Sequence, residues 1–328
     1  MFDKVTEIFN INCEAEFEEM ALKVFRFQYE HNVVYKHWVS SLVPSIEEVK
    51  TVKQIPFLPI ELFKTHPIVS YSGDTCHEIF TSSSTTGQIP SKHYVKDISL
   101  YKTSFLKCFQ KFFGKPSDHC ILALLPGYMD RQGSSLVYMC KELIELSQHN
   151  QSGFYLRNMN ELVDVIKELK AKKQKTILIG VSYALLDLAE MNIQLNEYFT
   201  VIETGGMKGN RREMLKEELH DVLKNKFKIK KIASEYGMTE LLSQAYALED
   251  GLFSYPNWMR FLIRDINDPL SYLGKNKTGG INVIDLANVY SCSFIATQDL
   301  GQLNDEGKLK LMGRYDSSDV RGCNLMVQ

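Results

Sequence analysis

The segment from residue 119 to residue 235 alternates apolar strands with helices, and this alternation constrains the fold more than any other feature of the chain. The expected strands are Cys120–Leu125, Thr176–Gly180, Phe199–Glu203 and Lys231–Ser234. The expected helices are Ser134–Leu146, Leu162–Leu169, Ala184–Met191 and Arg212–Leu223. Strands that alternate with helices in this way indicate βαβ units, so the sequence predicts an α/β fold built on a parallel sheet.

The segments on either side of this alternation indicate other structure. Residues 14–40 carry apolar side chains at helical spacing, and Ile55–Pro59 interrupts that pattern as an ordered connection. Beyond residue 250 the pattern changes to short strands with turns, for example Gly280–Ile284 and Lys308–Met312. We expect this last part to form a small antiparallel sheet or barrel packed on the parallel unit.

Composition excludes several classes of protein. The chain has 38 Lys and Arg against 40 Asp and Glu, so its net charge of −2 gives no reason to expect a nucleic-acid partner. The first residues do not read as a signal peptide, and no stretch approaches the ~20 apolar residues of a membrane-spanning helix. The seven cysteines are scattered and odd in number, which argues against a disulfide framework. We therefore expect a cytoplasmic protein without integral membrane contact.

The first segment with chemical potential is residues 81–92, where a run of hydroxyl side chains precedes a glycine and a lysine. Hydroxyls and backbone N–H groups on a turn can surround phosphate oxygens, and a nearby ammonium group neutralises them. The spacing does not fit the Walker pattern, and a plain surface loop is the alternative. The candidate residues are Ser82, Ser83, Ser84, Thr85, Thr86 and Gly87 for phosphate binding, with Lys92 as the catalytic cation.

The second segment is Ser234–Glu240, directly after an expected strand. Parallel sheets of this class bind ligands beyond the carboxyl ends of their strands. The ring of Tyr236 could stack on a purine, Thr239 could bond a phosphate, and Glu240 could hold Mg²⁺ through its carboxylate oxygens. The alternative is an exposed helix start with an incidental acid.

The third segment contains Thr297–Gly301 and continues to Gly313–Asp316. Asp299 could accept hydrogen bonds from both hydroxyls of a ribose. Between these two pieces, Asp305–Gly307 reads as a hairpin turn. Taken alone, most of this segment would be structural.

Together, in this order and spacing, these segments resemble the adenylate-forming enzymes, a superfamily of acyl-CoA ligases, firefly-type luciferases and peptide-synthetase adenylation domains. The hydroxyl loop resembles the signature Thr-Ser-Gly-Thr-Thr-Gly-x-Pro-Lys, Tyr236–Glu240 match Tyr-Gly-x-Thr-Glu in full, and the third segment resembles Thr-Gly-Asp and the Gly-Arg-x-Asp hinge. The resemblance covers roughly residues 55–328. It implies ATP and Mg²⁺ as cofactors and catalytic roles for Thr239 and Glu240, with Glu240 as the metal ligand. It implies nucleotide contacts from Gly205, Gly206, Tyr236, Gly237, Asp299 and Arg314, in addition to the hydroxyl loop.

The chain also departs from the superfamily pattern. Ser84 replaces the first loop glycine, Ile89 is an extra residue before Pro90, and Gln298 replaces the glycine before Asp299. Most members continue past the hinge into a mobile C-terminal domain that brings a lysine, whereas 14 residues follow Arg314 here. We expect the large N-terminal-type domain of this fold without the mobile domain. Its expected parts are a helical segment over residues 1–70, an adenylation domain over 71–313 and a short arm over 314–328.

Two further segments, Ile55–His66 and Leu125–Ser135, resemble the LuxE-type acyl-protein synthetases. This resemblance implies activation of a fatty acid as the acyl-AMP and capture of the acyl group as a thioester on a cysteine near the C-terminus. A partner acyl reductase or acyl carrier protein would then take the acyl group. Cys323 is the matching cysteine, and neighbouring Arg321 could favour its reactive thiolate.

Two alternatives stay open from the sequence. The first is a ligase of the phenylacetate-CoA ligase type, which passes the acyl group to coenzyme A or to a carrier protein and does not need Cys323. The second is a non-catalytic homologue that binds a nucleotide or a partner. The acid itself cannot be identified from the sequence, because the walls of its pocket come from distant apolar segments that look like core.

Overall fold

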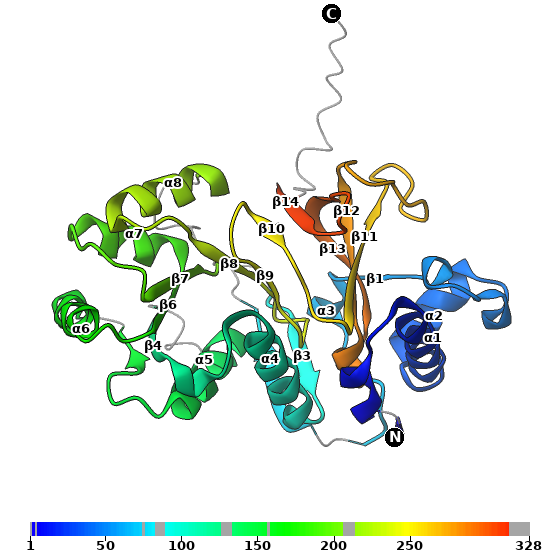
Figure 1. Ribbon diagram of the computed structural model, residues 1–328. Helices are drawn as coiled ribbons and strands as arrows, with labels where there is room; N and C mark the ends of the chain where they lie inside the picture. Colours follow the sequence, from blue (N-terminus) through cyan, green and yellow to red (C-terminus); the bar gives the residue numbers. More distant parts are fainter. Residues whose placement is uncertain are drawn as a thin grey trace, which may run out of the picture.

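The chain folds into two main sheets that lie side by side, one largely parallel and one antiparallel (Figure 1). The computed structural model describes residues 2–3, 5–73, 76–82, 89–125, 133–155, 158–205 and 214–314. The two sheets and the helices that pack on them confirm the expected α/β fold. Within the described residues, no helix combines the length and the apolar character that crossing a membrane requires.

The parallel sheet has the strand order β5-β4-β6-β7-β8-β9. All neighbours in it run parallel except β9, which is antiparallel to β8. Its central strands are continuous apolar runs because helices cover both faces. The strands are β4 (Cys120–Leu124), β5 (Gly153–Phe154), β6 (Thr176–Gly180), β7 (Phe199–Glu203), β8 (Ala233–Tyr236) and β9 (Ala245–Ala247).

Helices α7 and α8 lie on one side of this sheet, and α4 and α5 on the other (Figure 1). The helices of this half are α4 (Ile98–Phe113), α5 (Ser135–Ser147), α6 (Met159–Ala171), α7 (Ser182–Glu190) and α8 (Lys216–Phe227). Helix α8 begins four residues later than expected, and β8 lies two residues further along. The expected start of β8 was wrong because Lys231 is exposed, and pairing with β7 begins only at Ala233.

The antiparallel sheet has the strand order β10-β14-β13-β12-β11, and the short β1 pairs with β13 in parallel. This sheet confirms the antiparallel unit expected beyond residue 250. A separate hairpin of β2 and β3 carries the hydroxyl loop between its strands. The strands are β1 (Leu58–Pro59), β2 (Glu78–Thr81), β3 (Lys92–Val95), β10 (Leu252–Phe253), β11 (Met259–Arg264), β12 (Gly279–Asp285), β13 (Phe294–Leu303) and β14 (Leu309–Arg314).

The N-terminal segment forms two helices, α1 (Glu14–His31) and α2 (Val33–Leu42), where the sequence predicted one. Asn32 separates them because its side chain accepts a hydrogen bond from the Tyr35 backbone N–H and so caps a new helix. Buried Gln28 of α1 donates to the carbonyl of Val289 at 2.9 Å and ties the helix to the antiparallel half. The remaining short elements are α3 (Leu62–Thr65) and 3₁₀ turns at Val5–Asn10, Ile46–Glu48, Val52–Gln54, Pro116–Asp118 and Leu286–Asn288.

Candidate active site

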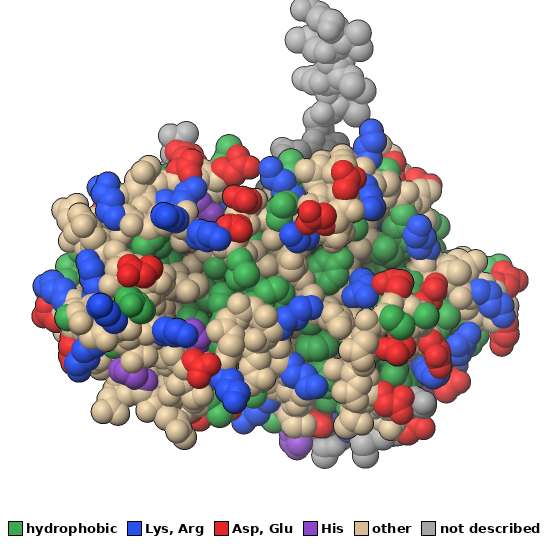
Figure 2. All heavy atoms as spheres, in the orientation of Figure 1, with side chains coloured by type: hydrophobic (Ala, Val, Ile, Leu, Met, Phe, Trp, Pro, Cys, Tyr) green, Lys and Arg blue, Asp and Glu red, His purple; other side chains and the backbone are tan. Residues whose placement is uncertain are grey.

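The second and third sequence segments meet where the two sheets join. Tyr236 ends β8 of the parallel sheet, and Asp299 lies in β13 of the antiparallel sheet. The Tyr236 hydroxyl donates a hydrogen bond of 2.8 Å to Asp299 Oδ2, although 63 residues separate the two. Residues that the sequence assigned to one nucleotide site are thus in contact. Figure 2 shows hydrophobic side chains gathered in the hollow between the two halves of this face.

Asp299 is paired in register with Arg314 of β14, the last described residue. The nearest atoms, Arg314 Nε and Asp299 Oδ1, lie 3.8 Å apart, and the Arg314 side chain is 59% exposed, so the ion pair is weak. Burial raises the pKa of Asp299, while the Tyr236 hydrogen bond and the charges of Arg314 and Arg264 oppose that rise. A ligand with hydroxyl groups would find here a carboxylate whose position is already fixed by its neighbours.

The Thr239–Glu240 segment is held from behind by two buried side chains. His93 Nδ1 donates to the Thr239 carbonyl at 2.8 Å, and Asn288 Nδ2 donates to the Glu240 carbonyl at 2.7 Å. His93 Nε2 lies 2.8 Å from the side-chain amide of Asn288, which links the two supports. Burial lowers the pKa of His93 to about 4, and its contacts with the Thr239 carbonyl and Asn288 oppose that fall. No sequence pattern predicts that His93 and Asn288 meet, because 195 residues separate them.

Glu240 connects the second segment to the first. Its side chain is buried, and it accepts a hydrogen bond from Ser91 at the end of the hydroxyl loop. Burial raises the pKa of Glu240, and the Ser91 bond together with the charges of Arg314 and Lys64 counteracts this effect. All three sequence segments therefore converge on one site.

The donor chemistry of Glu240 suits Mg²⁺. No group of three or more His, Cys, Asp or Glu side chains that could hold a metal ion lies among the described residues. Mg²⁺ at phosphate-transfer sites is held by one or two carboxylates together with substrate phosphates. The Glu240 carboxylate, bonded to Ser91 at the base of the hydroxyl loop, fits that arrangement.

The described residues of the hydroxyl loop are those at its base. Ser91 N donates to Ser82 Oγ at 2.8 Å, and Ser82 N donates to the Ser91 carbonyl at 3.1 Å, which closes the loop. Lys92 is exposed at the start of β3, opposite Thr81. Ser83, Ser84, Thr85, Thr86, Gly87, Gly206 and Cys323 lie outside the described residues.

Gly205 follows β7 and takes a backbone conformation with φ of +78° that favours glycine. Its N–H donates to Glu203 Oε1 at 2.6 Å. Glu203 is fully buried, and it also accepts from Ser182 at 2.5 Å and lies 3.3 Å from Lys216 Nζ. Burial alone would raise the pKa of Glu203, but His220, Lys216 and these hydrogen bonds outweigh it and hold that pKa at about 2. A permanent buried anion thus fixes the turn that the sequence assigned to the adenine side.

Ser234, His220 and Glu203 form a cluster that sequence reasoning did not find. The cluster is not the acid–base relay of serine hydrolases, because a relay uses both ring nitrogens of the histidine. Here Ser234 Oγ, at 3.0 Å, and Glu203 Oε2, at 3.9 Å, both face the same nitrogen, His220 Nε2. Ser234 is also fully buried. The cluster supports the Gly205 turn.

Gly237 lies against the carboxyl group of Glu235, which would overlap a Cβ atom at position 237. Burial raises the pKa of Glu235 to about 8. The charge of Lys216 opposes this rise, and the charge of Glu203 adds to it. A side chain at position 237 would therefore have to displace the buried Glu235 carboxyl group.

The sequence comparisons identify the family of this chain. The family described as acyl-protein synthetase, LuxE, matches residues 9–328. A relative from Aliivibrio fischeri, long-chain-fatty-acid–luciferin-component ligase, is 22% identical over 336 residues, which cover 94% of this chain and 87% of the relative.

Ligases of the adenylate-forming fold are among the solved structures that resemble this chain. A 2-hydroxyisobutyryl-CoA ligase in complex with 2-HIB-AMP and CoA has a TM-score of 0.67 at 11% identity, covering 93% of this chain and 70% of the ligase. ATP-bound MatB from Rhodopseudomonas palustris has a TM-score of 0.55 at 18% identity and covers 75% of this chain. This chain spans 49% of the length of MatB. At these identities the likeness establishes the fold.

Proposed function

Because the chain belongs to the acyl-protein synthetase (LuxE) family, we propose that it activates a carboxylic acid with ATP and transfers the acyl group to its own Cys323. One observation carries the proposal most. The three segments that the sequence assigned to ATP converge, with Ser91 bonded to Glu240 and Tyr236 bonded to Asp299.

In the first half-reaction a carboxylate oxygen of the acid attacks the α-phosphorus of ATP, the bond to the β-phosphate breaks, and pyrophosphate leaves. Asp299 accepts the ribose hydroxyls, and the Tyr236 ring and the Gly205–Gly206 turn face the adenine. Thr239, Lys92 and the hydroxyl loop contact the phosphates, and Glu240 holds Mg²⁺. When bound, Mg²⁺ neutralises charge on the triphosphate. Positioning and charge neutralisation carry this step, since no protein group has to react covalently.

In the second half-reaction the Cys323 thiolate attacks the acyl carbon, a thioester forms, and AMP leaves. Six other cysteines lie among the described residues, and four of them are buried. Burial raises the pKa values of Cys108 and Cys140 far above that of a free thiol, and it raises the pKa of Cys292 to about 12, so none of the three forms a useful thiolate at neutral pH. We therefore expect Cys323 to be a better acceptor of the acyl group than any of these three cysteines.

The acid is proposed to be a long-chain fatty acid, in line with the printed name of the Aliivibrio fischeri relative. The proposed consumer of the acyl group is an acyl reductase, with an acyl carrier protein as the alternative acceptor. The proposed compartment is the cytoplasm.

Intact mass spectrometry after incubation with MgATP and fatty acids of varied length tests the proposal. We expect a mass increase equal to one acyl group, removed by hydroxylamine because a thioester is labile to it. Cys323→Ser should keep pyrophosphate release and lose the adduct, whereas Cys13→Ser, a matched exposed cysteine, should change neither. Acylation of coenzyme A or a carrier protein with no adduct on the wild type would instead favour the ligase alternative.

A further inference from the structure

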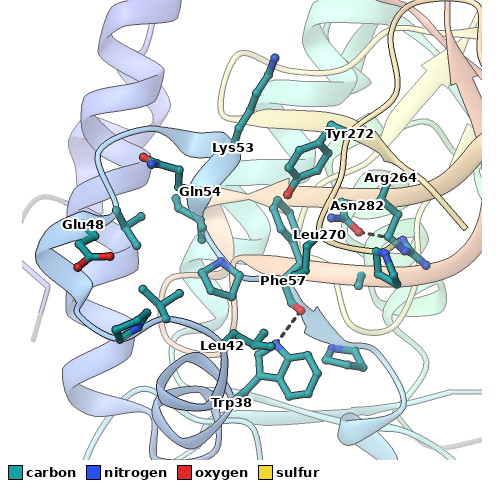
Figure 3. A pocket seen from close by; sticks show the side chains of 18 residues that line it. Trp38, Leu42, Glu48, Lys53, Gln54, Phe57, Arg264, Leu270, Tyr272 and Asn282 are labelled. Carbon is teal, nitrogen blue, oxygen red and sulfur yellow. Dashed lines mark hydrogen bonds between the residues drawn. The ribbon is translucent and has the colours of Figure 1, made fainter. Parts of the chain in front are cut away.

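A cavity of about 610 Å³ lies between the N-terminal helical segment and the antiparallel sheet. Trp38 of α2, Phe57, Leu270 and Tyr272 line it, and the rings of Phe57 and Tyr272 pack edge to face with their centroids 6.4 Å apart (Figure 3). The Trp38 indole N–H donates to the Phe57 carbonyl at 2.9 Å, which fixes the indole in the wall. This volume lies within the ~300–1,000 Å³ of pockets for small molecules. None of the proposed nucleotide contacts lines it, whereas the segment Ile55–His66 contributes Ile55, Phe57 and Pro59 to the lining.

The cavity opens to solvent through apolar side chains. Leu42 is 37% exposed and Leu270 is 65% exposed, and both line the cavity. These exposed lining leucines leave apolar surface in contact with water, which an apolar occupant would cover.

Among the described residues, a cation in the cavity wall donates its hydrogen bonds to neutral acceptors only. Arg264 at the end of β11 donates to the carbonyls of Ile281 and Thr297 at 2.7 and 2.5 Å and to Asn282 Oδ1 at 2.8 Å. These bonds leave donors of its guanidinium unused. Burial lowers the pKa of Arg264, and the charges of Glu61 and Asp299 oppose that fall, although neither carboxylate of this part of the described chain forms an ion pair with it. Figure 3 shows Glu48, the carboxylate that lines the cavity, on the side opposite Arg264.

We propose that this cavity binds a free long-chain carboxylic acid, with the hydrocarbon chain along Trp38, Phe57 and Leu270 and the carboxylate facing Arg264. An unbranched chain suits a cavity with an apolar lining, and one anionic head group matches one unpaired cation. Ala296 of β13 lines the cavity, and Asp299 follows three residues later, about 10 Å along the strand. The identification of the acid as a substrate rests on the proposed function, whereas its binding to the cavity does not.

Tryptophan fluorescence can detect the occupant directly. The chain has two tryptophans, Trp38 in the cavity wall and Trp258, which is buried and donates to Ser243 Oγ at 2.9 Å. In a Trp258→Phe variant, 9,10-dibromostearic acid should quench Trp38 saturably, because bromine quenches an indole on contact. Straight-chain acids should compete, with affinity rising about fourfold per added CH₂ until the cavity is full.

Two variants test the two halves of the occupant. Leu270→Glu places a charge at the exposed mouth without touching the core, and it should weaken binding of acids at least about tenfold. Arg264→Gln should weaken the binding of hexadecanoic acid at least about tenfold and leave the binding of hexadecanol unchanged. Val33→Glu, at an exposed apolar residue outside the cavity lining, is the matched control and should have no effect.

Absence of Trp38 quenching, or quenching that Leu270→Glu leaves intact, would overturn the proposal. Equal binding of acid and alcohol to the wild type would overturn the role of Arg264. Acid-dependent ATP–pyrophosphate exchange in the same preparations separates this inference from the proposed function. Quenching without exchange would support binding of the acid in the cavity and contradict activation of the acid. Exchange without quenching would support activation of the acid and contradict its binding in the cavity.

Discussion

The junction of the two sheets and the cavity beside the N-terminal helices differ in how their polar groups are satisfied. At the junction, Tyr236 already bonds Asp299, His93 bonds the Thr239 carbonyl, and Glu203 bonds the Gly205 N–H. In the cavity wall, Arg264 meets only neutral acceptors among the described residues, and leucines are exposed to water.

The difference separates two kinds of binding. A site whose protein groups hold one another in place is preorganised, so a ligand adds bonds to groups that move little. A site with unpaired charge and uncovered apolar surface is completed by its ligand. We therefore expect the junction to bind nucleotide and the cavity to bind acid, and variants in one region to spare the other.

Glu240→Ala should have the largest effect. Removing the carboxylate proposed to hold Mg²⁺ leaves the triphosphate charge poorly neutralised, so acid-dependent ATP–pyrophosphate exchange should fall at least about 100-fold. Quenching of Trp38 by dibromostearic acid should not change. Glu249→Ala, at an exposed glutamate paired with Lys231, is the matched control and should retain exchange. Wild-type exchange in Glu240→Ala would remove Glu240 from the site.

Asp299→Ala should weaken ATP binding about 10- to 100-fold, measured by calorimetry, because charge-assisted hydrogen bonds to the ribose are lost. Tyr236→Ala should also weaken ATP binding, through loss of ring contact with the base. Binding of pyrophosphate alone should be nearly unchanged in both variants. Unchanged ATP affinity in both would contradict the proposed nucleotide position.

Glu235→Gln should stabilise the protein in a pH-dependent way. Burial raises the pKa of Glu235 to about 8 from 4.5, so the folded state favours the protonated form. The wild type therefore loses stability as the pH rises from about 4.5 to about 8, and a neutral glutamine does not. At pH 9 the free energy of unfolding of Glu235→Gln should exceed that of the wild type by at least about 1.4 kcal/mol, one pKa unit. Urea unfolding measures this, and an equal difference at pH 5 would show that ionisation is not the cause.

The smallest effect should be that of Leu270→Glu on the binding of ATP. Its affinity for ATP should stay within about twofold of the wild type, because additivity holds for sites without shared partners. A large loss of ATP affinity would show that the cavity and the junction are one site, and would contradict the view that they bind different ligands independently.

The junction was largely predictable from the sequence because its residues come in short contiguous runs. Tyr236, Thr239 and Glu240 follow one strand, so a local pattern was enough to select them. Their supports were not predictable, because His93 and Asn288 come from distant segments and lone polar residues carry no pattern. The Ser91–Glu240 bond likewise depends on how the β2–β3 hairpin packs against the parallel sheet.

The fold shows the same limit. The apolar runs of β4, β6 and β7 are enough to predict these strands. Strand β13 contains Gly, Gln and Asp and carries no such pattern, and it forms because β12 and β14 pair with it. The break at Asn32 was missed because helical apolar spacing continues across it. The cavity could not be predicted at all, since its lining combines residues 38–59 with residues 264–296, and each apolar side chain there reads as core.

Acid-dependent ATP–pyrophosphate exchange by the wild-type protein tests the central claim most directly. With MgATP, labelled pyrophosphate and straight-chain acids of increasing length, we expect exchange that requires the acid, requires Mg²⁺ and strengthens with chain length. A protein that binds ATP but supports no exchange with any acid would contradict acid activation and identify the chain as a non-catalytic member of its family.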